Sequence, residues 1–149
     1  VDDGYTVAWG GDVSDDGFTR EGLAILVDTK KVADNEGSDM AKWLKLSAKE
    51  KNEKLKKLGA NVPEIIPTQE MRQEQYDNWE LADDHGMLIY GKAKDQNGRE
   101  YYMVKNSWGE TGAYKGTWYM SKNFIIAKTM DFLINKNAVP KDIRKKCGF

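Results

Sequence analysis

Two short apolar runs on either side of a turn signal constrain the fold of this chain more than any other feature of its sequence. The runs Met87–Tyr90 and Tyr101–Val104 are apolar and prone to form strands, and the segment between them contains the dipeptide Asn97-Gly98. Because Asn-Gly favours the tight turns of hairpins, the pattern predicts an antiparallel pair of strands. His85 then lies at the outer end of one strand and Asn106 at the outer end of its partner. The predicted hairpin thus brings the two side chains together.

His85 is the only histidine in the chain, so any chemistry that needs a base near neutral pH depends on it. An imidazole acts as a base when another group fixes its tautomer and its ring orientation, and the side-chain oxygen of an asparagine can do so. A single histidine, taken alone, is more often a structural residue. Its combination with Asn106 across a hairpin favours a catalytic pair instead.

The length and composition exclude several classes of partner. With 149 residues and a net charge of −1, the chain is about one domain long and lacks the basic stripe of a nucleic-acid-binding surface. Its apolar runs are much shorter than the ~18 residues of a membrane span, so we expect neither nucleic acid nor a membrane as a partner. Cys147 is the only cysteine, which excludes an internal disulfide and leaves the redox compartment open. A cytoplasmic location is favoured, and export would need a signal upstream of Val1.

Other apolar runs predict the remaining strands of a sheet. Residues 5–10, 117–120 and 129–135 contain aromatic and β-branched side chains and are bounded by glycine or by polar residues. The run Leu23–Val27 fits a buried strand, although so short a run also fits a helical turn. The whole pattern predicts an α+β fold, with an antiparallel half-barrel sheet and flanking helices.

A helix is predicted over about Ala48–Leu58. Ser47 and Glu50 have the spacing of a capping box, in which a hydroxyl and a carboxylate satisfy each other's backbone donors. Gly59 is placed to end this helix. The lysines within Lys49–Lys57 predict a solvated helix face rather than a surface for an acidic partner.

A second helix is predicted over about Gln69–Trp79. Thr68 can cap its beginning, and Met71, Gln75 or Tyr76, and Trp79 would lie on one face. Because this helix leads directly to His85, we expect it to support the strand that begins there. Residues 138–149 contain proline and several basic residues, and they predict a tail or a short surface helix.

The order of His85 and then Asn106-Ser107-Trp108-Gly109 resembles the second half of the active site of papain-like cysteine peptidases. Residues 7–13, 71–78, 83–87 and 106–110 resemble, in the same order, the branch that contains bleomycin hydrolase and aminopeptidase C. The resemblance implies that residues 1–149 are a single C-terminal lobe of such a peptidase, with 138–149 as its tail. It also implies that the whole protein is a thiol hydrolase that removes amino-terminal residues from peptides.

The resemblance implies roles for individual residues. His85 would be the base that accepts the thiol proton and the acid that protonates the leaving amine, and Asn106 would orient it. Trp108 would shield their hydrogen bond from water. A hydrogen bond that is shielded from water is stronger than one that is exposed to it. Gly86 and Gly109 would let the backbone approach the site closely. No cofactor and no metal is implied.

The nucleophile is expected outside this chain. In the resembled family the reactive cysteine lies at a helix N-terminus well before the histidine, after a glutamine that helps to bind the oxyanion. Nothing like Gln-x-Gly-x-Cys-Trp precedes His85, and Cys147 follows it in a basic tail, where we do not expect a nucleophile. We therefore expect a C-terminal portion that is inactive alone. Its expected partners are a missing N-terminal lobe, a peptide substrate and, by resemblance, other copies in a hexamer.

The alternative is a non-catalytic peptide-binding or interaction module that kept the fold and lost the nucleophile.

Metal chemistry is a weaker possibility. Residues 95–100 match only the beginning of a calcium loop, so they predict a hairpin turn. The aspartates at 12, 15, 16, 83 and 84 could be imagined as a metal site, but one histidine and the lack of a thiolate cluster disfavour it.

Overall fold

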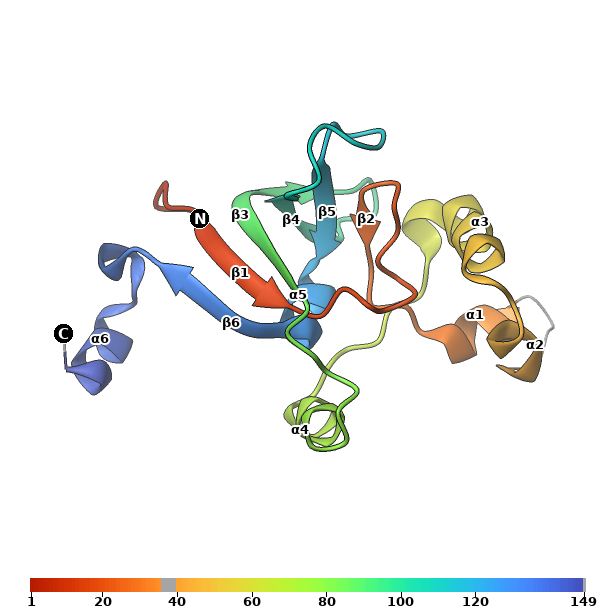
Figure 1. Cartoon of the computed structure of the whole chain (residues 1–149), viewed down its shortest axis with the longest axis horizontal. Coiled ribbons are helices and arrows are strands. Elements are labelled where there is room, and N and C mark those ends of the chain that lie inside the picture. The colour runs from red at the N-terminus through yellow and green to blue at the C-terminus, as the bar shows by residue number, and fades with distance from the viewer. Residues whose placement is uncertain (36–39, 149) are drawn as a thin grey trace.

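The computed structural model describes residues 1–35 and 40–148, and its centre is one six-stranded sheet (Figure 1). The strands are β1 (Val7–Gly11), β2 (Leu23–Ala24), β3 (His85–Lys94), β4 (Glu100–Lys105), β5 (Thr117–Ser121) and β6 (Thr129–Ile134). They lie in the order β2, β5, β4, β3, β1, β6. Every pair is antiparallel except β2 with β5, which is parallel. The sheet is therefore antiparallel as predicted, apart from this edge.

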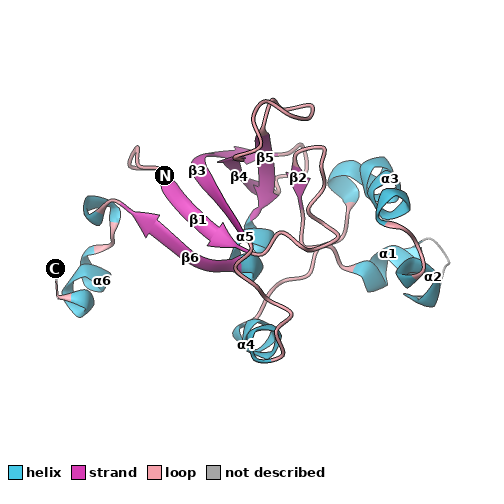
Figure 2. Ribbon diagram, in the orientation of Figure 1, coloured by secondary structure: helices cyan, strands magenta, loops and turns pink. Residues whose placement is uncertain are grey.

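Helices lie around the sheet (Figure 2). They are α1 (Thr29–Asn35), α2 (Met40–Leu44), α3 (Ala48–Leu58), α4 (Gln69–Asp77), α5 (Lys122–Lys128) and α6 (Lys141–Cys147), with short 3-10 helices η1 (Gly59–Asn61) and η2 (Lys136–Ala138). Helices α1 to α3 gather beyond the β2 edge, and α6 lies beyond the β6 edge (Figure 1). The predicted α+β class is confirmed. No helix in the described part of the chain is long and apolar enough to cross a membrane.

The predicted hairpin is formed by β3 and β4, with Ile89 opposite Val104 and an irregularity in the pairing before Gly91. Asp95 closes its turn, because its Oδ1 accepts hydrogen bonds from the backbone N–H groups of Asn97 and Arg99, both at 2.9 Å. Burial raises the pKa of Asp95, but these N–H groups outweigh it and hold that pKa below the ordinary value. The carboxylate is thus engaged by the turn, in agreement with the turn prediction for this segment.

The core explains why the hairpin keeps its register. Along β3, Met87 and Ile89 are buried and Leu88 and Tyr90 are exposed, as expected for a strand with one covered face. The larger cluster of buried side chains joins the sheet to α5: Trp9, Ala24, Leu26, Met87, Ile89, Val104, Trp118, Met120, Phe124 and Ala127. Strand alternation therefore places His85 on the covered face with Met87, at the rim of this core.

The capping box predicted the first helix correctly. Ser47 accepts a hydrogen bond from the backbone of Glu50, and the Glu50 side chain accepts one from the backbone of Ser47. The helix α3 covers Ala48–Leu58 and ends at Gly59, which has a φ of 52°. One residue of this helix, Leu55, is buried, so most of its surface faces solvent.

The second helix begins where predicted, with Thr68 accepting a hydrogen bond from Met71, but the packing predicted for it is wrong. The helix α4 ends at Asp77, and Trp79 follows in a left-handed conformation, with a φ of 64° and 89% of its surface exposed. No residue of α4 is buried. Arg72 attaches the helix instead, because its guanidinium donates hydrogen bonds to the carbonyl oxygens of Ile126, Ala127 and Thr129.

Two further elements differ from the sequence predictions. Leu23–Val27 forms a strand only over Leu23–Ala24, and Val27 makes an isolated bridge to Glu64. The helix α5, which was not predicted, connects β5 to β6 and is capped by Ser121. In the tail, α6 realises the predicted short surface helix with no buried residue, and Phe149 lies outside the described residues.

Candidate active site

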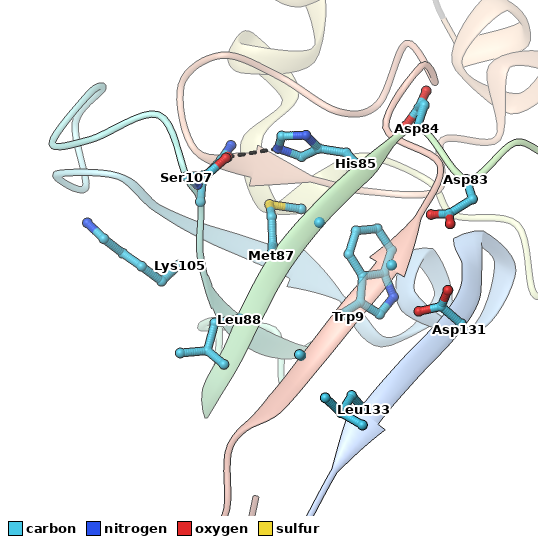
Figure 3. A pocket seen from close by; sticks show the side chains of 14 residues that line it. Trp9, Asp83, Asp84, His85, Met87, Leu88, Lys105, Ser107, Asp131 and Leu133 are labelled. Carbon is cyan, nitrogen blue, oxygen red and sulfur yellow. Dashed lines mark hydrogen bonds between the residues drawn. The ribbon is translucent and has the colours of Figure 1, made fainter.

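His85 and Asn106 meet at the open end of the hairpin, as predicted. His85 is the first residue of β3, and Asn106 directly follows β4. Nε2 of His85 lies 2.8 Å from Oδ1 of Asn106, and the dashed line in Figure 3 marks this hydrogen bond. The pairing of β3 with β4, which ends at Leu88 and Lys105, brings the chain ends that carry these two residues together.

The hydrogen bonds around Asn106 determine the tautomer of the imidazole. Oδ1 of Asn106 also accepts a hydrogen bond of 2.7 Å from the backbone N–H of Ser107. Since an N–H group needs an acceptor, this atom must be the amide oxygen, and Nε2 of His85 must then be the donor. The neutral imidazole therefore carries its proton on Nε2. Within the part of the chain that the structure describes, Nδ1 has no hydrogen-bond partner.

Asn106 is held more rigidly than a surface amide. It is 3% exposed, and its backbone N–H donates to the carbonyl oxygen of Gly116 at 3.0 Å. Its Nδ2 is buried and has no hydrogen-bond partner among the described residues. The side chain thus depends on its oxygen for all of its polar contacts, and these contacts fix the amide in the orientation that His85 needs.

Trp108 packs against the imidazole, with ring centroids 5.0 Å apart. Its indole also meets Trp118 and Phe18 edge to face, at 5.5 Å and 6.1 Å between ring centroids. Because Trp108 remains 46% exposed, it contacts the imidazole on one side and solvent on the other. The sequence prediction identified Trp108 but missed Phe18. The one hint to Phe18 in the sequence is that it is a single aromatic residue in an otherwise polar loop.

The two predicted glycines are not crowded within the chain. A Cβ atom at Gly86 or at Gly109 would have no heavy atom within 4 Å. Gly109 has a φ of 74°, so its backbone conformation favours glycine for a local reason. Neither glycine is needed for a close approach between parts of this chain.

An open groove of about 650 Å³ adjoins His85 on the outer face of the sheet (Figure 3). Small residues on β1 and β3, namely Ala8, Gly10 and Gly86, contribute to its lining and leave the space unfilled. Leu88 and Leu133 line it with apolar surface. A peptide lying in such a groove would pass along the end of β3 that carries His85.

Acidic side chains lie at the end of the groove near β6. Asp83 and Asp131 point toward the same place in Figure 3, where a Cβ atom on Gly10 would lie 3.1 Å and 2.7 Å from their carboxylate oxygens. This end of the groove is therefore negative. The described residues contain no group of three or more His, Cys, Asp or Glu side chains that could hold a metal ion.

Asp84, which precedes His85, has a structural task that the sequence did not reveal. Its Oδ1 accepts a hydrogen bond of 3.0 Å from the backbone N–H of Val13, and its own N–H donates to the carbonyl oxygen of Gly11 at 3.3 Å. Gly11 is in turn paired with His85 across β1 and β3. The loop that leads into His85 is thus fastened to the end of β1.

Cys147 lies away from this site. Gly11 pairs with His85 on one side and with Thr129 on the other, so His85 lies near the residue where β6 begins. The helix α6, which contains Cys147, follows the opposite end of β6. At ~3.3 Å per residue, β6 alone separates the two ends by roughly 17 Å. Figure 1 shows α6 beyond the far end of β6, and Cys147 is exposed there. The structure does not bring this thiol to the imidazole.

Comparison with known proteins identifies the family. The Peptidase C1-like family matches residues 33–148. Aminopeptidase C from Lactobacillus helveticus is 30% identical over 74 residues, which cover 50% of this chain and 16% of that protein. Cathepsin L from Sarcophaga peregrina is 45% identical over 40 residues, which cover 27% of this chain and 12% of that protein.

The fold has a counterpart among solved structures. The crystal structure of PepW from Lactobacillus rhamnosis matches 95% of this chain with a TM-score of 0.55 and 21% sequence identity, and the match spans 26% of PepW. The chain thus corresponds to only a part of each of these proteins. The resemblance that the motifs suggested is confirmed. This chain belongs to the Peptidase C1-like family, with a papain-like fold and sequence similarity to aminopeptidase C.

Proposed function

We propose that this chain supplies the histidine and the asparagine of a papain-like cysteine peptidase that removes amino-terminal residues from peptides. The observation that carries the proposal is the 2.8 Å hydrogen bond between His85 Nε2 and Asn106 Oδ1, which leaves Nδ1 available as a base. The similarity to aminopeptidase C supports action at the amino terminus of the substrate.

In the proposed reaction, a thiol gives its proton to Nδ1 of His85, which produces a thiolate and an imidazolium. The sulfur attacks the carbonyl carbon of the first peptide bond, and the carbonyl electron pair moves onto oxygen. When the carbonyl forms again, the C–N bond breaks and the leaving nitrogen takes the proton from Nδ1. Water then attacks the thioester and gives a proton to Nδ1, which returns it to the sulfur. The amino acid and the thiol are released.

Asn106 acts through the imidazole in this scheme. The Nε2–H bond to its oxygen persists in both protonation states, so Nδ1 keeps facing the thiol throughout the reaction. When the ring becomes an imidazolium, the same hydrogen bond becomes charge-assisted and stronger. Asn106 therefore stabilises the ion pair in addition to orienting the ring.

The thiol in this proposal comes from outside the chain, because Cys147 lies beyond the other end of β6. The oxyanion donors would come with it, from a lobe that resembles the N-terminal part of related peptidases. Leu88 and Leu133 support such a partner, since these apolar side chains line the groove and are 39% and 77% exposed. Without the lobe, we expect the chain to be inactive. A homo-oligomer, such as a hexamer, is a further proposal from family resemblance.

The test begins with the coding sequence upstream of Val1, where we expect a Gln-x-Gly-x-Cys-Trp segment. The complete gene product is then assayed with an aminoacyl-coumarin and with the same compound acetylated on its α-amine. We expect turnover of the free amine only, abolished by iodoacetamide and by His85→Ala. Turnover of the acetylated compound at an equal rate would refute the aminopeptidase assignment.

The alternative, a non-catalytic module that kept the fold, predicts a different result in the same experiment. It requires an upstream sequence without a cysteine at that position and no thiol-dependent turnover. Binding of peptides in the groove would then be unaffected by His85→Ala. The upstream sequence alone therefore distinguishes the two functions.

A further inference from the structure

Lys128 is a buried cation close to the candidate site. It ends α5 and is 5% exposed. Its Nζ lies 3.2 Å from Oδ2 of Asp15 and 3.7 Å from Oδ2 of Asp12, and Asp12 is completely buried. Burying charged groups costs free energy, and apolar side chains of similar volume could fill the same space. We therefore look for a role of this buried cation and its two carboxylates other than packing.

Both carboxylates belong to one short stretch of chain, residues 11–18, which we call the 11–18 segment. The backbone of this segment also rests on Lys128, because the N–H of Asp12 donates to the Lys128 carbonyl oxygen at 3.0 Å. A Cβ atom on Gly11 would lie 2.3 Å from that same oxygen. Lys128 therefore holds the 11–18 segment through its side chain and through its backbone.

Each carboxylate also organises the segment locally. Oδ1 of Asp12 accepts hydrogen bonds from the backbone N–H and from the hydroxyl of Ser14, at 2.8 Å and 2.6 Å. Oδ1 of Asp15 accepts one from the backbone N–H of Gly17 at 2.8 Å. In both residues the other oxygen, Oδ2, lies within ion-pair distance of the ammonium group of Lys128, and Oδ2 of Asp12 has no hydrogen-bond partner among the described residues. The two local turns are thus joined by a single cation.

The 11–18 segment reaches the candidate site at both of its ends. At its beginning, the Gly11 carbonyl oxygen accepts a hydrogen bond from the N–H of Asp84, the residue before His85, and the Val13 N–H donates one to the Asp84 carboxylate. At its end, Phe18 contacts the edge of Trp108, which packs on the imidazole. The segment therefore supports the backbone of His85 on one side and the aromatic cover of its ring on the other.

From these contacts we infer that Lys128 is a positioning residue for the His85–Asn106 pair. By joining Asp12 and Asp15, it fixes the shape of the 11–18 segment, and the segment then places both His85 and Trp108. The inference deepens the proposed function, since it concerns the same pair of residues, but it can be tested without catalysis.

His85 supplies the probe, because it is the only histidine in the chain. In the 149-residue chain labelled with ¹⁵N, the ring nitrogen shifts report the tautomer, and exchange of the Nε2 proton with water reports the bond to Asn106. Lys128→Met removes the charge while keeping most of the side-chain length. We expect it to accelerate this proton exchange by about tenfold or more and to shift the ring signals toward a mixture of tautomers.

Two controls separate positioning from general stability. Lys128→Arg keeps the charge and should preserve the slow exchange. Lys122→Met removes an exposed lysine from the same helix and should change nothing. If Lys128→Met folds cooperatively and leaves both the exchange rate and the ring shifts unaltered, Lys128 has only a structural role and the inference is wrong.

A second variant keeps the inference falsifiable if Lys128→Met does not fold. Asp15→Asn weakens the shorter of the two ion pairs at a partly exposed residue, and we expect a smaller acceleration of the same exchange. Unchanged exchange in this variant would equally overturn the inference. The exchange measurement reports the geometry of the His85–Asn106 pair and not turnover. If the exchange rate does not respond to these variants, the proposed function is still possible. If the complete protein is inactive, the inference about Lys128 still holds.

Discussion

Replacing Asn106 by alanine isolates the contribution of ring orientation to the proposed reaction. The substitution removes the oxygen that accepts the Nε2 proton of His85, but it leaves the imidazole itself in place. The ring can then rotate or adopt the other tautomer, and in either case Nδ1 no longer faces the thiol in its basic form. We therefore expect a loss of activity smaller than the loss caused by removing the base.

The structure bounds the magnitude of this effect. A hydrogen bond to a charged group contributes about 1.5–3 kcal/mol, which corresponds to a loss of about ten- to 150-fold in kcat/KM. Because Trp108 is half exposed, water can reach the ring and replace part of the bond, which favours the lower half of that range. Removing the base in His85→Ala eliminates the covalent route, and by analogy with other catalytic units we expect a loss of about 10⁴-fold or more.

The assay measures kcat/KM of the complete gene product on an aminoacyl-coumarin. Asn97→Ala, at the tip of the same hairpin, is a matched control and should retain full activity, because that turn lies at the other end of the strands. Full activity of Asn106→Ala would refute the reasoning. So would a loss as large as that of His85→Ala, since orientation would then not be separable from proton transfer.

Three further predictions concern the indole cover, a helix cap and a turn. Trp108→Ala should lower kcat/KM by about tenfold, measured as above, because it opens the partly shielded His85 hydrogen bond fully to water, whereas Trp79→Ala at the other exposed tryptophan should not. Ser47→Ala should destabilise the chain by about 1 kcal/mol in urea unfolding, since it removes the N-cap of α3; an unchanged midpoint would contradict this. Asp95 has a lowered folded-state pKa, so its stabilisation is complete above the unfolded pKa of about 3.9 and is lost as pH falls through the folded value. The difference in thermal stability between the parent and Asp95→Asn should therefore be largest near pH 7 and shrink below about pH 3.9; a difference that does not depend on pH would show that the carboxylate charge is irrelevant.

The hairpin and its two polar residues were predictable because the signals are local. Two apolar runs and an Asn-Gly turn lie within about twenty residues, and the alternation along β3 leaves one consistent register. Continuing that register from the Leu88–Lys105 pair sets Asn106 opposite Met87, which lies on the same face of β3 as His85. The capping box of α3 was equally local, since Ser47 and Glu50 need only each other.

The failures have physical causes that a local pattern does not contain. The apolar face expected for α4 does not exist, because Trp79 adopts a left-handed conformation and α4 is attached through the polar contacts of Arg72. The helix α5 was missed because its two adjacent isoleucines, in a seven-residue stretch between two strands, resemble a strand. The parallel pairing of β2 with β5 depends on contacts between residues far apart in the sequence.

The parts of the site that sequence reasoning missed are also long-range. Phe18 reaches Trp108, and Lys128 reaches Asp12 and Asp15, across most of the chain. A buried lysine leaves no periodic pattern in the sequence. An aspartate in a polar loop is a common turn residue, so the sequence indicates a turn there and not an ion pair. The hydrogen bond from the Asp12 N–H to the Lys128 carbonyl oxygen joins the end of α5 to the chain just after β1.

The most direct test of the central claim compares the 149-residue chain alone with the same chain supplemented by the upstream lobe. We expect background hydrolysis of an aminoacyl-coumarin by the chain alone. When the lobe is added, we expect turnover that iodoacetamide abolishes, and we expect that turnover to be lost in His85→Ala but not in Cys147→Ser. Turnover by the chain alone that iodoacetamide and Cys147→Ser both abolish would make Cys147 the nucleophile and would contradict the account.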